Sequence, residues 1–162
     1  MAGELYDLAR LYLNSDRAEE AEPLLRRSLE IREKNLGPDH NDVALVLNSL
    51  AMALQKQGWN EQAVPLFRRA QAIWEKSLGA DHPNVAWALH NSAESYRLQG
   101  QYAAAESLCN RALAIWEKAY GPDNHLAVLP LAKLAAIYQV TGREASADTL
   151  LQRVAAIRAL KR

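Results

Sequence analysis

The sequence predicts an all-α protein, a right-handed α-solenoid of four helix-turn-helix repeats. Two observations lead to this prediction. A glycine-led motif recurs every 42 residues, as GPDHND at Gly37, GADHPN at Gly79 and GPDNHL at Gly121. When the chain is aligned at that period, apolar residues fall into shared columns with the i, i+3/i+4, i+7 spacing of amphipathic helices. One helix pair cannot bury its own apolar face but stacked pairs can, which favours a solenoid.

The alignment divides the chain into four repeats, residues 1–36, 37–78, 79–120 and 121–162, and the first lacks its opening six positions. We number the columns of the alignment from the glycine as column 1. Columns 15 and 27 hold alanine in every repeat: Ala9, Ala51, Ala93 and Ala135, then Ala21, Ala63, Ala105 and Ala147. We expect residues 1–162 to form a single domain.

Each repeat is expected to contain two helices and no strand. Apolar residues at columns 7, 8, 11, 14, 15 and 18 define the first helix, which a left-handed residue ends at column 22: Gly58, Gly100, Gly142 and, in the first repeat, Asp16. Apolar residues from column 27 to column 37 define the second helix. We expect Asn60 or its neighbour to cap the second helix of its repeat, and the column 1 glycine to end that helix in the same left-handed way.

Two prolines, Pro23 and Pro65, share column 29 inside the second helix. They are expected about one turn from the helix start, where the lost N–H group is nearly unneeded.

The histidines His40, His82 and His125 recur in the connector between repeats, each close behind an aspartate. We interpret Asp39, Asp81 and Asp123 as helix caps and Pro83 as a first-turn residue. A metal site at His82 and His90 fails on geometry, because eight helical residues span about 12 Å and zinc ligands lie about 2 Å from their ion. No metal ligand or cofactor is expected.

Catalytic patterns are absent from the sequence as well. The single cysteine, Cys109, occupies column 31, where the other repeats have Leu25, Phe67 and Leu151, so it is expected to be an inert core thiol. No G-x-S-x-G motif or phosphate-binding glycine loop occurs. We therefore predict no catalytic residue and no enzymatic activity.

Composition restricts the partners and the compartment. Lysine plus arginine and aspartate plus glutamate number 19 each, whereas nucleic-acid binders usually carry a basic excess. One cysteine permits no intramolecular disulfide, which suits a reducing compartment. No apolar run approaches a membrane span, and charges interrupt the first residues as a signal peptide would not allow. We expect a cytoplasmic protein that binds neither nucleic acid nor membranes.

The repeat resembles the tetratricopeptide repeat, through Leu89, Ala93, Tyr96, Gly100, Ala105, Leu108 and Ala112 and their column mates. The period of 42, with LNSLA at 47–51 and GADHPNVA at 79–86, is similar to the kinesin light chain variant of that family. Ala132 and Lys133 stand where that family usually has asparagine, and Ser92 stands in a leucine column. The resemblance implies a non-enzymatic protein-interaction module, a scaffold or adaptor.

By the same resemblance, the first helices line a concave face on which columns 9, 12, 13, 16, 19 and 20 meet a ligand. The predicted peptide-binding residues are Tyr6, Arg10, Asn14, Leu45, Asn48, Ser49, Met52, Lys56, Trp87, His90, Asn91, Glu94, Arg97 and Lys133. Asparagine amides can bond a peptide backbone, and the cations can pair with carboxylates. The alternative is that this face is merely solvated, or covered by another part of a longer protein.

A second hypothesis is that the chain is a self-associating or structural segment of a larger repeat array or of a multidomain regulatory ATPase. Neither end has an obvious polar capping helix, which terminal repeats normally need for solubility. The first repeat has eight acidic and six basic residues, and the fourth has three acidic and six basic. Opposite charge at the two ends could orient a partner or favour head-to-tail contact.

Overall fold

The computed structural model describes residues 1–160, which contain no strand. The α-helices in this range are α1 (Ala2–Asn14), α2 (Ala18–Leu36), α3 (Asn41–Lys56), α4 (Asn60–Leu78), α5 (Pro83–Leu98), α6 (Tyr102–Tyr120), α7 (Val128–Val140) and α8 (Glu144–Ala159). A 3₁₀ turn, η1 (His125–Ala127), leads directly into α7. The predicted four helix pairs and the all-α class are therefore confirmed.

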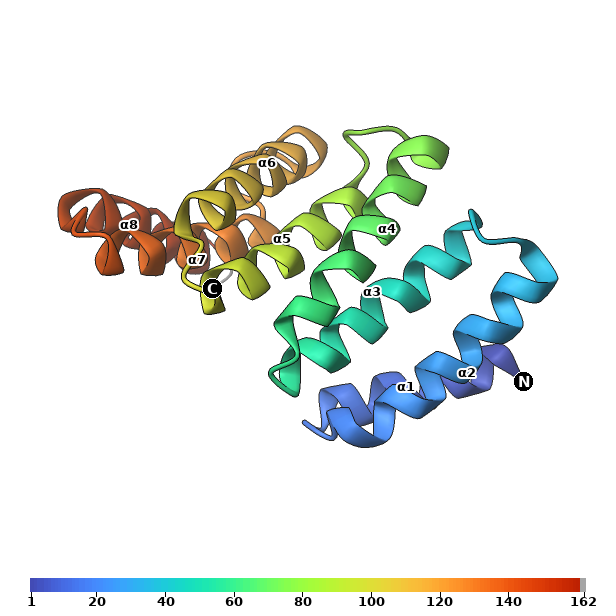
Figure 1. Ribbon diagram of the computed structural model, residues 1–162. Helices are drawn as coiled ribbons and strands as arrows, with labels where there is room; N and C mark the ends of the chain where they lie inside the picture. The colour runs from blue at the N-terminus through green and yellow to red at the C-terminus, as the bar shows by residue number, and fades with distance from the viewer. Residues whose placement is uncertain (161–162) are drawn as a thin grey trace. The chain divides into compact units, whose positions relative to one another are not determined.

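The chain forms two compact units, Met1–Ala80 with α1 to α4 and Asp81–Arg162 with α5 to α8. Within each unit, consecutive helices pack against one another, and the two first helices also touch (α1 with α3, α5 with α7). Figure 1 shows α2 lying along α3 in the first unit and α6 passing close to α7 in the second. That residues 1–162 act as a single domain stays a prediction.

The alanine columns lie at the centre of each helix pair. Every alanine of columns 15 and 27 is at most 1% exposed. A methyl side chain at these positions lets the two helix backbones approach closely, while larger neighbours such as Leu25 and Phe67 fill the space beside them. The alanines that recur every 42 residues in the sequence are thus the residues at which the two helices of each repeat pack together.

The residues that end the helices follow the prediction at column 22 and differ from it at column 1. Gly58, Gly100 and Gly142 have φ between 74° and 86°, and Asp16 has φ 55°. The column 1 glycines also have positive φ, 87° to 96°, but their ψ of 154° to 163° is extended rather than left-handed helical. The chain leaves the second helix straight into the connector, in a region that side chains other than glycine essentially never adopt.

The helix caps correct the prediction for the connector aspartates. Histidine lies immediately before α3 and α5, and its Nδ1 accepts the backbone N–H of the second helical residue at 3.1 Å, from Asp42 to His40 and from Asn84 to His82. The aspartates sit one residue too early to cap. Asp39 instead pairs with Lys76 in the last turn of α4, and Asp81 pairs with Lys118 in the last turn of α6. Each connector is thereby bound to the second helix of the repeat that it begins.

In the fourth repeat, Asn124 takes the place of the capping histidine, and its Oδ1 accepts the N–H of Ala127 at 3.0 Å. The expectation that Asn60 or its neighbour caps α4 is met in position alone, because the N-cap residue is the neighbour Trp59 but no side chain makes a capping hydrogen bond. The Asn60 amide donates back to the carbonyl of Gly58 at 3.3 Å. Pro23 and Pro65 lie inside α2 and α4 near their starts, as predicted. They are the sixth residues of these helices, where the N–H group normally bonds within the helix, so the expectation that this group is nearly unneeded is wrong.

The histidine caps can be tested at His82. Replacing His82 with Ala removes the acceptor for the Asn84 N–H, so we expect the free energy of unfolding to fall by about 1 kcal/mol in urea denaturation. His82→Asn, which restores an acceptor at the cap position, should recover most of that loss. Equal destabilisation by both variants would contradict the capping role, and His125→Ala, at a connector residue that does not cap, is the matched control.

Candidate peptide-binding grooves

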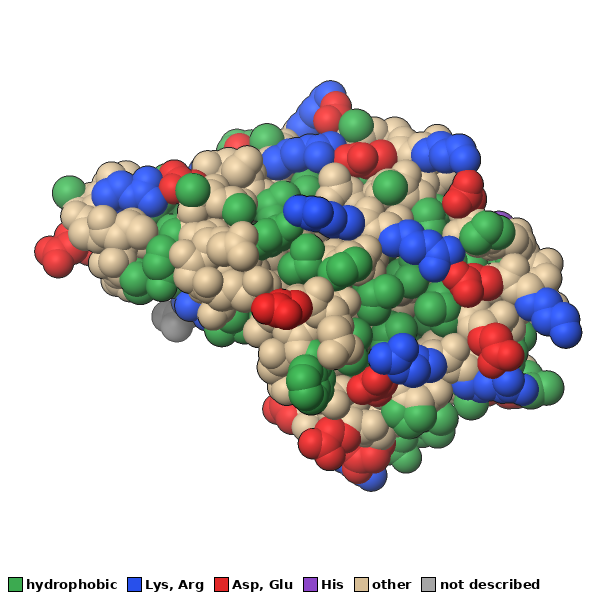
Figure 2. Space-filling view, viewed as in Figure 1, with side chains coloured by type: hydrophobic (Ala, Val, Ile, Leu, Met, Phe, Trp, Pro, Cys, Tyr) green, Lys and Arg blue, Asp and Glu red, His purple; other side chains and the backbone are tan. Residues whose placement is uncertain are grey.

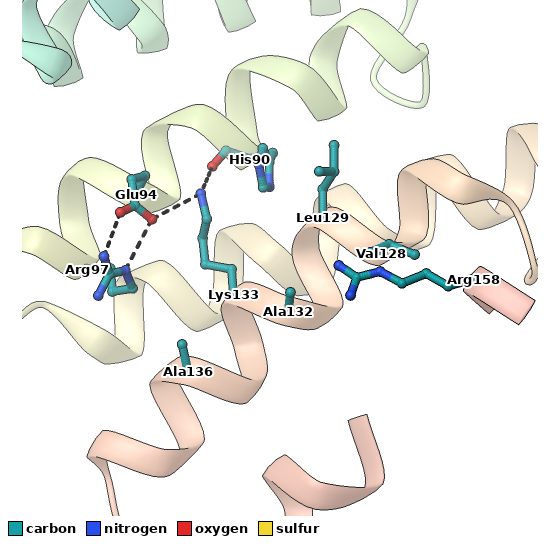
Figure 3. A pocket seen from close by; sticks show the side chains of 9 residues that line it. All are labelled: His90, Glu94, Arg97, Val128, Leu129, Ala132, Lys133, Ala136 and Arg158. Carbon is teal, nitrogen blue, oxygen red and sulfur yellow. Dashed lines mark hydrogen bonds and ion pairs between the residues drawn. The ribbon is translucent and has the colours of Figure 1, made fainter. Parts of the chain in front are cut away.

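The predicted ligand-facing residues lie on the first helices α1, α3, α5 and α7, and the structure gathers most of them into one groove in each unit. The α1/α3 groove has a volume of about 350 Å³ and is lined by Tyr6, Arg10, Leu13, Asn14, Leu45, Asn48, Ser49 and Met52. The α5/α7 groove has a volume of about 440 Å³ and is lined by His90, Glu94, Arg97, Val128, Leu129, Ala132, Lys133, Ala136 and Arg158 (Figure 3).

In the α1/α3 groove, three of the predicted residues form a buried floor. Tyr6, Asn48 and Ser49 are each less than 9% exposed. The Ser49 hydroxyl donates to the Tyr6 hydroxyl at 3.3 Å, and the Asn48 amide lies 3.8 Å from the Met52 sulfur. The Ser49–Tyr6 hydrogen bond joins α3 to α1. Because the three floor residues are buried, they offer a ligand less surface than the sequence pattern suggested.

The side chains that stand around this floor are exposed. Arg10, Asn14 and Leu45 are all exposed, and Leu45 retains 37% of its surface. The Arg10 guanidinium lies 5.8 Å from the centre of the Tyr6 ring and has no ion-pair partner within residues 1–160. This groove therefore combines an accessible cation, an amide and an apolar side chain.

A second guanidinium beneath the same groove was not anticipated from the sequence. Arg32 of α2 lies 5.2 Å from the Tyr6 ring centre, with 12% of its side chain exposed, and donates to the backbone carbonyl of Asp42 at 3.2 Å. It occupies column 38, where the second and third repeats have Trp74 and Trp116. The break in that tryptophan column was the available signal.

An ionic network crosses the α5/α7 groove (Figure 3). Arg97 binds Glu94 with two nitrogens, at 2.6 and 3.1 Å. The Lys133 ammonium reaches from α7 to α5, where it lies 3.3 Å from a Glu94 oxygen and donates to the His90 carbonyl at 2.9 Å. Arg97 and Lys133 were expected to pair with a ligand; in this structure both bind Glu94, and Lys133 also joins α7 to α5.

Burial shapes the titration of this network. Burial alone would raise the pKa of Glu94, but its hydrogen bond to Arg97 and the charges of Lys133 and Arg97 outweigh that effect and lower the pKa. The pKa of Lys133, whose side chain is only 11% exposed, is lowered by burial despite the attraction of Glu94. Glu94 thus stays ionised near neutral pH and is the counter-charge on which the buried ammonium depends.

His90 packs among aromatic rings beside the network. Its ring centre is 6.5 Å from that of Trp87 and 5.8 Å from that of Trp116, which is fully buried. Burial and the Lys133 charge lower the His90 pKa to about 3, so the imidazole is neutral at physiological pH. Its Nδ1 and the Trp116 Nε1 are buried without a hydrogen-bond partner in the part of the chain described.

Three predicted residues lie outside the two groove linings. Lys56 pairs with Asp16 in the turn of the first repeat. Asn91 is half-buried on α5, and Trp87, 37% exposed, stands beside the groove with its edge against Trp116. Arg158 of α8, by contrast, lines the α5/α7 groove although it was not among the predicted ligand-facing residues; it occupies column 38, where the second and third repeats have Trp74 and Trp116. Figure 3 shows its side chain beside Val128, and it has no ion-pair partner within residues 1–160.

The structure also places the residues considered for other chemistry. Cys109 is fully buried, and burial raises the pKa of its thiol to about 11, so the thiolate form is negligible near neutral pH. No group of three or more His, Cys, Asp or Glu side chains in residues 1–160 is arranged to hold a metal ion. In the same range, no helix combines the length and apolar character needed to cross a membrane. On the face seen in Figure 2, acidic and basic side chains are interspersed over the first unit.

Comparison with known families identifies the repeat. A family model described as Tetratricopeptide repeat matches three overlapping segments, residues 2–63, 42–108 and 85–159. The chain belongs to the tetratricopeptide repeat family. Proteins of this family are in general protein-interaction modules rather than enzymes. The match supports this general role and no narrower function.

Solved structures support the same assignment. A Podospora anserina protein assigned as a kinesin light chain with nearly identical TPR-like repeats is 31% identical at a TM-score of 0.82, over 96% of this chain and 74% of that one. BtubC (BKLC) from P. vanneervenii is 25% identical at a TM-score of 0.88, over 99% of this chain and 64% of that one. The predicted kinesin-light-chain-like variant of the repeat is thereby confirmed.

A more distant structure, a Rap protein complexed with competence and sporulation factor, has a TM-score of 0.84 at 20% identity, over 98% of this chain and 42% of that one. At this identity the likeness concerns the fold alone. The comparison with curated proteins gave no match.

The neutral state of His90 gives a pH prediction. An unfolded histidine binds a proton below about pH 6.5, whereas folded His90 does so only near pH 3. Stability from His90 is therefore complete above pH 6.5 and is lost as the pH falls towards 3, by about 1.4 kcal/mol per pH unit within that window.

We expect urea denaturation between about pH 7 and pH 5 to show wild type losing stability faster than His90→Phe, which keeps a neutral ring among the tryptophans. Carboxylates titrate in both proteins, so the difference between the two curves isolates His90. Parallel curves would show that folded His90 takes up its proton over the same pH range as the unfolded histidine, which would contradict the prediction.

The counter-charge role of Glu94 gives a second prediction. Glu94→Gln leaves the buried Lys133 ammonium without its carboxylate, so we expect a loss of about 1–3 kcal/mol in the free energy of unfolding, measured in urea. Glu4→Gln breaks a fully solvated pair with the amino terminus and should have no measurable effect. Equal effects of the two substitutions would mean that the Glu94 network adds no stability.

Proposed function

We propose that this chain is a peptide-binding scaffold in which each groove holds an extended partner segment through a carboxylate and an apolar side chain. The observation that carries the proposal is an arrangement found twice. In each groove an exposed arginine without an ion-pair partner in residues 1–160 accompanies a leucine that keeps 37% of its surface exposed: Arg10 with Leu45, and Arg158 with Leu129.

The charge of both grooves favours an acidic segment. The α1/α3 lining contains Arg10 and no acidic residue. The α5/α7 lining contains the three cations Arg97, Lys133 and Arg158 against the single carboxylate of Glu94. An excess of positive charge in a recess attracts carboxylates, and a free guanidinium can bind one through two parallel hydrogen bonds.

The remaining lining residues suit the main chain of an extended peptide. The exposed Asn14 amide in the α1/α3 groove can both donate to and accept from a peptide bond. In the α5/α7 groove, the α7 side of the lining includes the small side chains of Ala132 and Ala136, so a peptide backbone can approach α7 closely. The network of Glu94 with Arg97 and Lys133 fixes the opposite wall, which reduces the ordering cost of binding.

The proposal can be tested by selecting displayed random peptides on the purified chain and measuring the affinity of the selected sequences by calorimetry. We expect the selected peptides to pair an Asp or Glu with a large apolar residue. Arg10→Gln and Arg158→Gln should each weaken the peptides bound at their own groove about tenfold, as expected for loss of one charge-assisted contact.

Lys34→Gln is the matched control, because this exposed lysine lies in the last turn of α2 outside both groove linings. It should leave every affinity unchanged. Selection of peptides without acidic residues, or affinities that the double variant Arg10→Gln with Arg158→Gln does not alter, would refute the proposed recognition.

A further inference from the structure

The contact between the third and fourth repeats shows what one repeat offers the next. Leu134 and Ile137 of α7 are buried in one cluster with Ala105 and Cys109 of α6. Polar groups close the edge of this cluster at Glu106, which accepts the Tyr138 hydroxyl at 2.9 Å and both Arg143 guanidinium nitrogens at 3.0 and 2.7 Å.

The contact between the first and second repeats follows the same columns. Leu50 and Ala53 of α3 share a cluster with Ala21 and Leu25 of α2. Glu22, in the column of Glu106, accepts the side-chain amide of Gln57 at 2.8 Å. Inside each unit, then, an alanine, a carboxylate and an apolar residue on a second helix meet two apolar residues and a hydrogen-bond donor from the following repeat.

The first repeat carries the following-repeat half of this contact, and no other repeat within residues 1–160 covers it. We call Leu8, Leu11, Tyr12 and Arg17 the head face. Leu8 and Leu11 are 41% and 63% exposed, whereas Leu134 and Ile137 in the same columns are 2% and 0% exposed.

The polar part of the head face is also formed. The Arg17 guanidinium lies 4.4 Å from the Tyr12 ring centre, as Arg143 lies 3.9 Å from that of Tyr138. Arg17 pairs only with the exposed Glu20 of its own helix, at 2.9 Å, and the Tyr12 hydroxyl has no hydrogen bond in residues 1–160. In the fourth repeat, Tyr138 and Arg143 together bind the Glu106 carboxylate, and we call such a tyrosine–arginine pair the clamp. The first repeat has the same pair in Tyr12 and Arg17, but no carboxylate from another repeat within residues 1–160 binds it.

The end of the chain carries the other half. We call Asp148 and Leu151 of α8 the tail face, which corresponds column by column to Glu106 and Cys109. Leu151 is 40% exposed where Cys109 is fully buried. Asp148 is exposed and has neither an ion pair nor a hydrogen bond within residues 1–160.

We propose that the tail face of one copy of this chain binds the head face of a second copy. Leu151 packs against Leu8 and Leu11, and the Asp148 carboxylate accepts the Tyr12 hydroxyl and the Arg17 guanidinium, in the manner of Glu106. This contact would use the same columns as the junctions between consecutive repeats inside each unit. The acidic excess of the first repeat and the basic excess of the fourth also attract each other.

Such a contact joins two different surfaces, so it does not stop at a dimer unless the rotation closes a ring. Sedimentation velocity of the wild-type chain from about 10 to 500 µM should show a weight-average mass that rises with concentration and falls with added salt. A mass that stays monomeric over the whole range would overturn the proposal.

Complementation between blocked faces gives the sharper test. Leu11→Lys blocks only the head face and Leu151→Lys only the tail face, and both positions are exposed, so folding should be unaffected; circular dichroism checks this. Each variant alone should stay monomeric. Their mixture retains one intact head and one intact tail, so it should form 1:1 heterodimers that grow no further. A mixture that remains monomeric, or single variants that still assemble, would refute the interface.

The clamp is tested by charge reversal. Arg17→Asp and Asp148→Arg should each weaken assembly about tenfold or more, and the double variant Arg17→Asp with Asp148→Arg, which places opposite charges across every contact again, should recover assembly. Leu45→Lys in the α1/α3 groove is the matched control and should assemble as wild type does. Because this control lies in the peptide groove, failure of peptide binding and failure of self-assembly are distinguishable.

Discussion

The close approach of the two helices in each repeat is the constraint on which the other features depend. It is made at the alanine columns, where side chains of one methyl group are at most 1% exposed in every repeat. A larger side chain there would push the helices apart and disturb the packing of the next repeat, because cores transmit small changes in volume. With the pairs fixed at this spacing, α1 meets α3 and α5 meets α7, and the grooves lie between them.

The polar residues of the grooves serve the fold and recognition together. Ser49 and Tyr6 join α1 to α3, and Lys133 joins α7 to α5, so side chains that a sequence pattern assigns to a ligand are partly used to hold the groove walls. What remains for a ligand is a smaller set at the rim. The guanidinium groups of Arg10 and Arg158 and the apolar surfaces beside them are free because no neighbouring repeat within residues 1–160 uses them.

The sequence predicted the helices and their order because the 42-residue period records contacts that recur four times. It also predicted the glycines of column 22 and the buried Cys109. It failed where residues depart from the period or where one position decides a role. His40 and His82 cap their helices because they lie next to the first helical residue, and the more familiar capping residues, Asp39 and Asp81, lie one residue too early.

The groove linings were predicted in part for a related reason. Column positions show which helical face a residue occupies, and Arg10, Leu45 and His90 do line a groove, although their binding of a ligand stays a prediction. They do not show how far a side chain reaches or which neighbour binds it first. The engagement of Arg97 and Lys133 by Glu94, and the entry of Arg158 from a second helix, depend on distances between helices that one sequence does not contain.

The prolines of column 29 divide the repeats into two kinds. Pro23 and Pro65 are the sixth residues of α2 and α4, and each removes one backbone hydrogen bond of its helix. At the same column α6 has Ser107 and α8 has Thr149, whose hydroxyl donates to the carbonyl of Ala145 at 3.0 Å. A helix that lacks an interior bond near its start resists fraying less at that end. The first unit therefore has two compliant helix starts in equivalent places, and the second unit has none at that column. Under a pulling force, or on binding a partner that bends a repeat, we expect the starts of α2 and α4 to open before the starts of α6 and α8.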